Sequence, residues 1–149
     1  MTFFTSEYES KLDSKGRIVL PAKIKNNLPE EAGSEVVIGR GFDKCIFLYS
    51  MVEYNKIYAK IAALSGFNEE NRKLKRTYFQ GISVVELDAN GRFLIPKLLL
   101  AYSGIERDAV VVGMGNYVEI WNPGLYYESL INDPQEFNAL AQEKLDGDG

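Results

Sequence analysis

Two stretches of alternating apolar and polar residues, each interrupted by a tight turn, predict paired strands in both halves of the chain. Glu9–Asp13 and Val84–Asp88 are typical of strands that enter a turn, and Arg17–Leu20 and Arg92–Ile95 of strands that leave it. In each turn an Asp stands first and a Gly fourth, the pattern of a type I turn whose last residue takes positive φ. We therefore expect two β-hairpins. The residues expected on their buried faces are Ile18, Leu20, Phe93 and Ile95.

Proline residues and apolar spacing predict the helices. Pro21 and Pro96 stand where the first turn of a short helix is expected, because a missing N–H is harmless there. Pro29 is expected to end the first short helix, and the second is expected to run on to Gly104. The buried face of the first short helix is expected to comprise Ala22, Ile24 and Leu28. Longer helices are expected at 52–65, 68–79, 123–132 and 134–145.

Valine-rich runs at 36–38 and 110–112 predict two further strands, each followed by a Gly-x-Gly turn into another strand. A dinucleotide site needs a helix directly after its glycines, so Gly39 and Gly41 are interpreted as structural. Cys45 lies in a strand-like apolar run, where a free thiol is expected to pack as a small hydrophobe. These strands complete the set of predicted elements.

The chain contains an internal repeat. Leu12–Pro21 aligns with Leu87–Pro96 at an offset of 75 residues, with Leu, Asp, Gly, Arg and Pro identical. Further matches join 36–41 to 110–115 and 46–49 to 118–121. The order of elements is therefore β-hairpin, short helix, β-hairpin and helices, twice, with a first repeat at 1–79 and a second at 80–149. Each repeat is small for independent folding, so we expect one shared core with an approximate two-fold axis.

Charge is divided unevenly between the repeats. The 149 residues carry a formal net charge of -4, which by itself argues against a polyanionic partner such as DNA. Residues 1–79, however, hold 13 Lys and Arg against 10 Asp and Glu, a net +3, whereas 80–149 hold 4 against 11, a net -7. Five basic residues and one acidic residue lie between Lys11 and Lys25. The first repeat therefore has a positive local field.

Composition excludes several function classes. The chain has no histidine, which excludes Ser-His-Asp, Cys-His and histidine-ligated zinc sites. A single cysteine, Cys45, excludes an internal disulfide. No apolar stretch approaches the roughly 20 residues that cross a bilayer, and residues 1–7 lack the features of a secretory signal, so a cytoplasmic protein is expected. The sequence indicates no catalytic residue, metal site, cofactor or small-molecule substrate.

The doubled Leu-Asp-x-x-Gly-Arg-x-x-x-Pro motif, the Pro21–Lys23 helix start and the 75-residue spacing resemble the MraZ family of bacterial transcription regulators over essentially the whole chain. The resemblance implies an α+β, mostly β fold in which two AbrB-like repeats share a pseudo-two-fold swapped-hairpin barrel, with helices packed around it. It also implies a nucleoid-associated, DNA-binding repressor of the operon for cell division and cell-wall synthesis. Such proteins assemble into rings and bind short repeats in double-stranded promoter DNA.

Arg17, held at the base of a hairpin, is the first candidate for a base contact, because a guanidinium can bind guanine bidentately. Asp13 is expected to orient this arginine or to accept N–H groups of the turn. Asn90 and Arg92 are the corresponding candidates in the second repeat, where Ala89-Asn90 replaces a loop lysine and Leu100 stands near a position often basic in the family. The second repeat is therefore expected either to contact DNA or to act as fold partner or assembly surface. Candidate phosphate contacts are Lys11, Lys15, Lys23, Lys25 and Lys97, and the motif residues with a structural role are Asp13, Gly16, Asp88 and Gly91.

Other interpretations of the same residues stay open. The Asp13/Arg17 and Asp88/Arg92 pairs are also compatible with purely structural ion pairs, or with a carboxylate pair for acid/base chemistry or magnesium binding. An AbrB-like antitoxin is a further alternative, although the tail after Leu145 is short for wrapping a toxin. The nine tyrosines lack a stacking-platform spacing and are expected in the core or in interfaces. The basic run Arg72, Lys73, Lys75 and Arg76 predicts a solvated helix face, with phosphate contact as the alternative.

Overall fold

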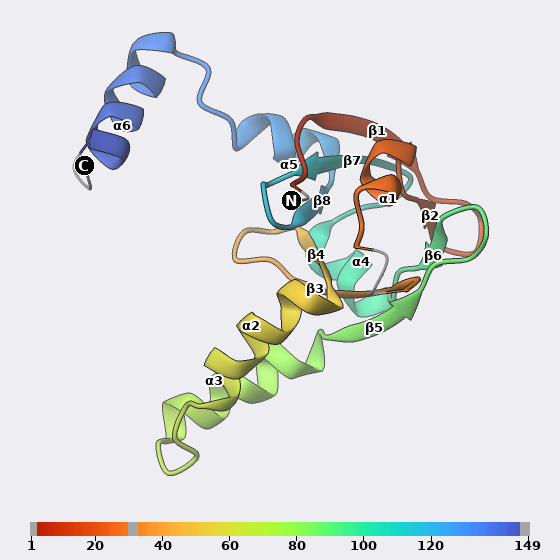
Figure 1. The fold of residues 1–149 in the computed structure, drawn as a ribbon, viewed down its shortest axis with the longest axis vertical. Coiled ribbons are helices and arrows are strands. Elements are labelled where there is room, and N and C mark those ends of the chain that lie inside the picture. Colours follow the sequence, from red (N-terminus) through yellow and green to blue (C-terminus); the bar gives the residue numbers. More distant parts are fainter. Residues whose placement is uncertain (1–2, 30–32, 147–149) are drawn as a thin grey trace.

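The computed structural model describes residues 3–29 and 33–146 (Figure 1). Residues 1–2 and 147–149 lie outside the described residues. The expectations about a secretory signal and about the tail after Leu145 rest partly on them. In chain order the described elements are β1 (Glu7–Lys11), β2 (Arg17–Val19), α1 (Ala22–Asn26), β3 (Glu35–Arg40), β4 (Ile46–Ser50), α2 (Met51–Ala62), α3 (Glu69–Gln80), β5 (Ser83–Glu86), β6 (Arg92–Leu94), α4 (Lys97–Ser103), β7 (Asp108–Gly113), β8 (Val118–Trp121), α5 (Pro123–Glu128) and α6 (Pro134–Asp146).

The strands of the two repeats interleave in one structure. A six-stranded antiparallel sheet has the order β1-β7-β8-β4-β3-β5, and β2 pairs with β6 in a separate two-stranded ribbon. The first strand of each repeat thus pairs with the other repeat, β1 with β7 and β5 with β3. The sheet and the ribbon enclose one hydrophobic core (Figure 1). The predicted α+β class, with strands exchanged between the two repeats, is confirmed.

The two simple hairpins expected around the Asp and Gly turns are wrong. The turns themselves are as predicted: Gly16 N–H donates to the Asp13 carbonyl at 3.1 Å, and Gly16 has a φ of 83°. Beyond the turn, the two backbones form an isolated bridge between Leu12 and Ile18, and the Ser10 hydroxyl donates to the Val19 carbonyl at 3.1 Å, but the strands form no continuous ladder. They then separate, β1 to β7 and β2 to β6. Alternation specifies which face of a strand is buried but not which strand lies beside it.

Two sets of strand pairs show the approximate two-fold axis. In the ribbon, Ile18 lies opposite Phe93, its own equivalent in the repeat. In the large sheet, Phe47 lies opposite Glu119, again its equivalent. A two-fold rotation about these central pairs places each residue on its equivalent in the other repeat. It therefore superposes the pair Arg17–Leu94 on the pair Arg92–Val19 in the ribbon, and the pair Ile46–Ile120 on the pair Val118–Leu48 in the sheet. The internal repeat is therefore expressed as pseudo-symmetry of the fold.

The core draws its side chains from both repeats. Ile18, Leu20, Phe93 and Ile95 are at most 3% exposed, as the alternation predicts, and they pack with residues of β3, β4, β7 and β8. Cys45 is fully buried against Val110, Trp121 and Tyr126, which confirms its role as a small hydrophobe. The shared core explains how two short repeats fold, because neither supplies enough apolar surface alone.

Several predicted boundaries need correction. Pro21 and Pro96 precede α1 and α4 as the capping residues and are not inside their first turns. Helix α1 ends at Asn26, before the predicted stop at Pro29. Ala22, expected on the buried face, is exposed, because this short helix contacts the core only through Ile24. Helix α5 ends at Glu128, four residues early, and β1 and β5 begin before the predicted strands. The longer helices α2, α3 and α6 are confirmed, as are the strands on both sides of Gly39 and Gly41.

In the part of the chain that the structure describes, no helix combines the length and the apolar character needed to cross a membrane.

The three-residue strands β2 and β6 depend on the core contact between Ile18 and Phe93. We predict that Phe93→Ala lowers the free energy of unfolding by about 3–5 kcal/mol, because a large buried ring leaves a cavity. Urea denaturation measures the change. Leu94→Ala, at the neighbouring and 54% exposed position, is the matched control and should cost less than about 1 kcal/mol. Equal losses for both variants would contradict the assigned burial.

Candidate nucleic-acid interface

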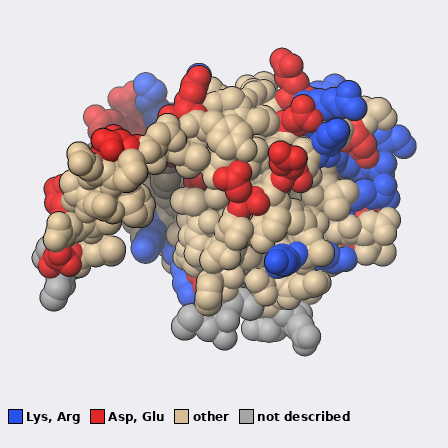
Figure 2. All heavy atoms as spheres, turned by 90° about the horizontal axis from the view of Figure 1, so that it is seen from above, with Lys and Arg blue, Asp and Glu red and all other residues tan. Residues whose placement is uncertain are grey.

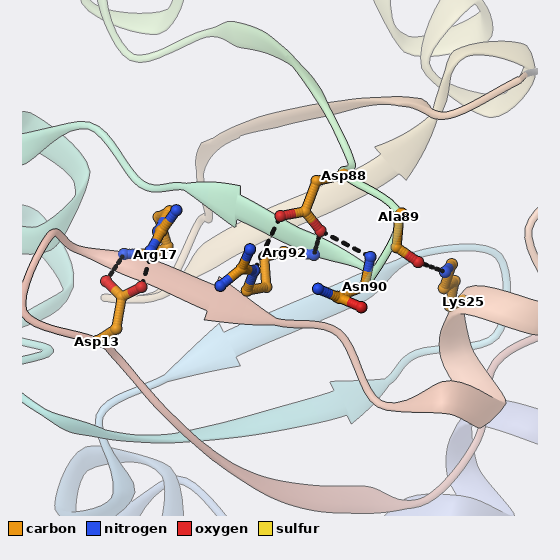
Figure 3. Close-up of polar contacts among 7 residues, drawn as sticks. All are labelled: Asp13, Arg17, Lys25, Asp88, Ala89, Asn90 and Arg92. Carbon is orange, nitrogen blue, oxygen red and sulfur yellow. Dashed lines mark hydrogen bonds and ion pairs between the residues drawn. The ribbon is translucent and has the colours of Figure 1, made fainter.

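The outer face of the β2–β6 ribbon carries the motif residues of both repeats (Figure 3). Since Ile18 and Phe93 point into the core, their neighbours on each strand point outward. These are Arg17 opposite Leu94, and Val19 opposite Arg92. Both arginines are only partly exposed, whereas Val19 and Leu94 are 44% and 54% exposed. Two sites that are 75 residues apart in the sequence therefore form one surface.

Asp13 accepts three hydrogen bonds from its own loop, two of them from Arg17. Its Oδ1 accepts the backbone N–H groups of Lys15 and Arg17, each at 2.9 Å, and its Oδ2 accepts the Arg17 Nε–H at 2.7 Å. The short acidic side chain closes the turn and orients the guanidinium at the same time. These are the contacts of an orienting residue.

The second loop repeats this geometry. Asp88 Oδ1 accepts the backbone N–H groups of Asn90 and Arg92 at 2.9 Å, and its Oδ2 accepts the Arg92 Nε–H at 2.8 Å. The two motifs are thus equivalent in structure although the second loop has no lysine of its own. Figure 3 shows both arginines between the two carboxylates, each of which is bound to its own loop.

The loop contacts keep both aspartates ionised. The backbone N–H of Arg17, helped by its side chain and by the Lys15 N–H, lowers the pKa of Asp13 to about 2, against a smaller opposing effect of burial. The backbone N–H of Arg92 is likewise the main cause that holds the pKa of Asp88 below its usual value. Each arginine is therefore paired with a full negative charge at neutral pH.

The terminal nitrogens of both guanidinium groups are available. Asp13 and Asp88 bind the Nε–H groups, and the Nη atoms of Arg17 and Arg92 form no hydrogen bond with the described residues. Each arginine side chain is about one-third exposed, 34% for Arg17 and 35% for Arg92. A guanidinium held by one edge presents a fixed two-nitrogen fork, which loses little conformational freedom on binding. This arrangement suits a ligand that has two hydrogen-bond acceptors in one plane.

The repeats also brace each other's loops. Leu20 N–H donates to the Gly91 carbonyl at 2.9 Å, and Ile95 N–H donates to the Gly16 carbonyl at 3.0 Å. Lys25 of the first repeat donates from Nζ to the Ala89 carbonyl at 3.0 Å. The second loop thus obtains a positive charge from the first repeat. Sequence reasoning missed this contact, although the two repeats differ in charge at this position, where Lys25 aligns with Leu100.

The remaining candidate lysines lie on elements that adjoin the ribbon. Lys15 is in the first loop, Lys11 ends β1, Lys23 is in α1 and Lys97 begins α4. All four are exposed and form no ion pair or hydrogen bond through their side chains with the described residues. Figure 2 shows Lys and Arg gathered at one edge of the molecule, the edge at which the two loops lie in Figure 1.

The structure does not bring the basic run of α3 to this surface. Helices α2 and α3 form an arm that projects from the body away from the ribbon (Figure 1). Within the arm, Arg72 donates to the Gly66 carbonyl at 2.8 Å and Lys75 to the Ala62 carbonyl at 3.4 Å. Among the described residues, no group of three or more Cys, Asp or Glu side chains is placed to hold a metal ion.

Comparison with known proteins gives the family. A profile described as "MraZ protein, putative antitoxin-like" matches residues 3–77 and again residues 78–147. The chain is 54% identical over 145 residues to the transcriptional regulator MraZ of Cytophaga hutchinsonii, which covers 97% of this chain and 96% of that protein. It is 37% identical over 142 residues to the transcriptional regulator MraZ of Christiangramia forsetii, covering 95% and 92% respectively.

The depressed pKa of Asp13 predicts a pH dependence of the first loop. Because the folded-state value, about 2, lies below the ordinary 3.8, the stability from this carboxylate is present above about pH 4 and is lost as the pH falls toward 2. Carbon-13 NMR titration of the Asp13 carboxyl should give a midpoint near 2. Arg17→Ala should raise that midpoint only part of the way, since the backbone N–H at residue 17 remains. A midpoint at the ordinary value in the unmodified protein would contradict the loop geometry.

Proposed function

Because the chain belongs to the MraZ family, we propose that it is a transcriptional regulator that reads promoter DNA with the outer face of the β2–β6 ribbon. In this proposal residues 1–79 and 80–149 are two repeats of one DNA-binding unit. Its finer parts follow the family resemblance: repression of the operon for cell division and cell-wall synthesis, short promoter repeats as the target, assembly into a ring, and association with the nucleoid in the cytoplasm.

The observation that carries the proposal is the pair of braced arginines, Arg17 and Arg92, on one antiparallel ribbon. A two-stranded ribbon fits the major groove of B-DNA. There, guanine presents O6 and N7 to a guanidinium fork, and each good bidentate contact contributes roughly 1–3 kcal/mol of discrimination. The carboxylates of Asp13 and Asp88, which hold the two guanidinium groups, are expected to lie behind the arginines and out of contact with the DNA.

The other residues of the face have complementary roles in this proposal. Val19 and Leu94, exposed beside the arginines, offer apolar contact to thymine methyl groups. Lys15 in one loop and Lys25 beside the other place one ammonium group at each end of the ribbon. Lys25 donates one of its three N–H groups to the Ala89 carbonyl, so two N–H groups remain for phosphate oxygens. Phosphate contacts on both sides would set the register of the ribbon on the duplex.

Arg17→Ala and Arg92→Ala are each expected to weaken binding to the promoter repeat by about 5- to 150-fold, from the loss of one bidentate contact. Quantitative gel shifts with a single repeat of the upstream DNA measure the change, and circular dichroism checks the fold. Lys44→Ala, in the exposed turn between β3 and β4, removes one positive charge outside the ribbon and should leave the affinity unchanged. Unchanged affinity in both arginine variants would exclude the ribbon as the reading surface.

Lys15→Ala is expected to weaken binding to all sequences alike, because a phosphate contact carries no sequence information. The slope of log K against log salt should fall by about 0.9, the contribution of one neutralised phosphate. Binding titrations between 50 and 200 mM salt, on specific and on scrambled DNA, separate this effect from that of Arg17→Ala, which should act mainly on the specific duplex. A slope equal to that of the unmodified protein would place Lys15 outside the interface.

A further inference from the structure

A buried carboxylate lies on the face of the large sheet that is turned away from the ribbon. Val118 and Ile120 of β8 point into the shared core, against which the ribbon also packs, so the side chain of Glu119 between them points to the opposite face. Glu119 is only 9% exposed. Its cross-strand partner and equivalent in the first repeat is Phe47, so the second repeat has a charged group where the first has an aromatic ring. Burial of a charge is costly, and this charge therefore needs compensation.

Neighbouring side chains give this carboxylate hydrogen bonds but no cation. Tyr117 Oη donates to Oε2 at 3.2 Å, and Trp121 Nε1 donates to Oε1 at 3.0 Å. These neutral donors fill two of the roughly four acceptor positions of a carboxylate. Among the described residues, no lysine or arginine forms an ion pair with Glu119. Its neighbours therefore orient the negative charge without neutralising it.

A groove rich in aromatic side chains opens onto Glu119. It has a volume of about 800 Å³, within the range of small-molecule sites, and lies between α2, α3 and α5 over β4, β7 and β8. The aromatic residues that line it include Phe47, Tyr49, Tyr78, Tyr117, Trp121 and Tyr126. Tyr49 and Tyr117 stack with their ring centres 4.9 Å apart, and Tyr49 meets Phe47 edge-on at 5.2 Å. The faces of such rings carry partial negative charge and attract cations.

The other charged side chains of the groove do not cancel this charge. Asp43 and Lys60 are exposed at the rim, where water and salt screen them, and their charges are opposite. Arg40 is held by other partners. Its Nη2 donates to Gln80 at 2.9 Å, and its guanidinium carbon lies 5.1 Å from the centre of the Tyr102 ring. The rim therefore has mixed charge and favours neither sign.

The floor of the groove, in contrast, is negative. Of the described charged side chains in the lining, only Glu119 is buried. Burial, and after it the charge of Glu119, raises the pKa of Tyr49 and of Tyr117, so the field of the carboxylate reaches both hydroxyls. A neutral ligand would take water from the carboxylate without replacing it, and an anion would be repelled. A cation would be attracted by the carboxylate and by the ring faces.

We propose that this groove binds a small organic ammonium ion that has an apolar body. The N–H groups of the ligand would donate to the remaining acceptor positions of Glu119, and its body would lie among the aromatic rings. The site is on the face of the sheet opposite to the core that the ribbon covers. It is therefore a second binding function, which does not depend on how the chain contacts DNA.

Trp121 provides a reporter inside the site, because it is the single tryptophan of the chain and its Nε1–H donates to Glu119. The full chain is titrated at neutral pH with benzylamine, with benzyl alcohol as a neutral probe of similar shape, and with phenylacetate as an anionic probe. The indole N–H signal in nitrogen-15 NMR should shift with benzylamine and reach saturation. Benzyl alcohol should bind at least about 10-fold more weakly, because it lacks the charge, and phenylacetate should bind least.

Two variants assign the binding to the groove. Glu119→Gln keeps the size of the side chain and an acceptor for the indole N–H but removes the charge, so it should weaken benzylamine binding at least about 10-fold and abolish the preference over benzyl alcohol. Asp43→Asn, the same change of acid to amide at the exposed rim, is the matched control and should change the affinity by less than about twofold. Ile61→Trp fills the groove and leaves the carboxylate intact, so it should weaken benzylamine and benzyl alcohol alike. Circular dichroism checks the fold of each variant.

Several outcomes would overturn the proposal. Equal affinities for benzylamine and benzyl alcohol would exclude recognition of the charge, and tighter binding of phenylacetate would indicate an anion site governed by Lys60 and Arg40. Unchanged benzylamine binding in Glu119→Gln or in Ile61→Trp would place the ligand outside the groove, and a shift that never saturates would indicate non-specific contact only. None of these titrations contains DNA, so each of these results leaves the proposal for the ribbon unaffected.

Discussion

The pairing of β2 with β6 is the constraint on which the rest of the molecule depends. Each strand has three residues, too few for a stable ribbon in water, and their only central pair is Ile18 with Phe93. Burial of that pair in the shared core compensates for the short ladder, and the cross-repeat bonds to the Gly16 and Gly91 carbonyls fasten its ends. The exchange of strands thus does two things together. It builds one core from two small repeats, and it sets Arg17 and Arg92 side by side.

Much of the local structure could be predicted from the sequence, because it depends on near neighbours in the chain. The turn at Asp13–Gly16 follows from the positions of Asp and Gly, and the inward direction of Ile18 and Phe93 follows from alternation. The partner of each strand could not be predicted in this way, because an apolar face packs equally well beside either repeat. The contact of Lys25 with Ala89 depends on that exchange, across 64 residues of sequence, and so it emerged only in three dimensions.

The equal geometry of the two loops changes the meaning of the charge division. A net +3 against -7 suggested one DNA-reading repeat and one supporting repeat. In the structure, Asp88 holds Arg92 as Asp13 holds Arg17, and Lys25 serves the loop that has no lysine. Part of the acidic excess lies elsewhere, including helix α6, which holds one basic and three acidic residues. The two repeats therefore share the Asp-x-x-x-Arg loop geometry, whereas their carboxy-terminal helices are opposite in charge.

This combination has a directional consequence for DNA recognition. The ribbon is two-fold symmetric in Arg17 and Arg92 but not in its loops, since Ser14-Lys15 faces Ala89-Asn90 across the axis. A single chain bound to DNA as proposed would therefore have a polarity, because Lys15 belongs to its own loop whereas the lysine at the other loop, Lys25, comes from α1. Isologous dimers place two such units in opposite directions and suit inverted repeats, whereas head-to-tail contacts keep them in one direction. Ribbons that follow one another in the same direction would thus match direct repeats in the DNA, and several moderate contacts at matching spacing would bind far more tightly than one.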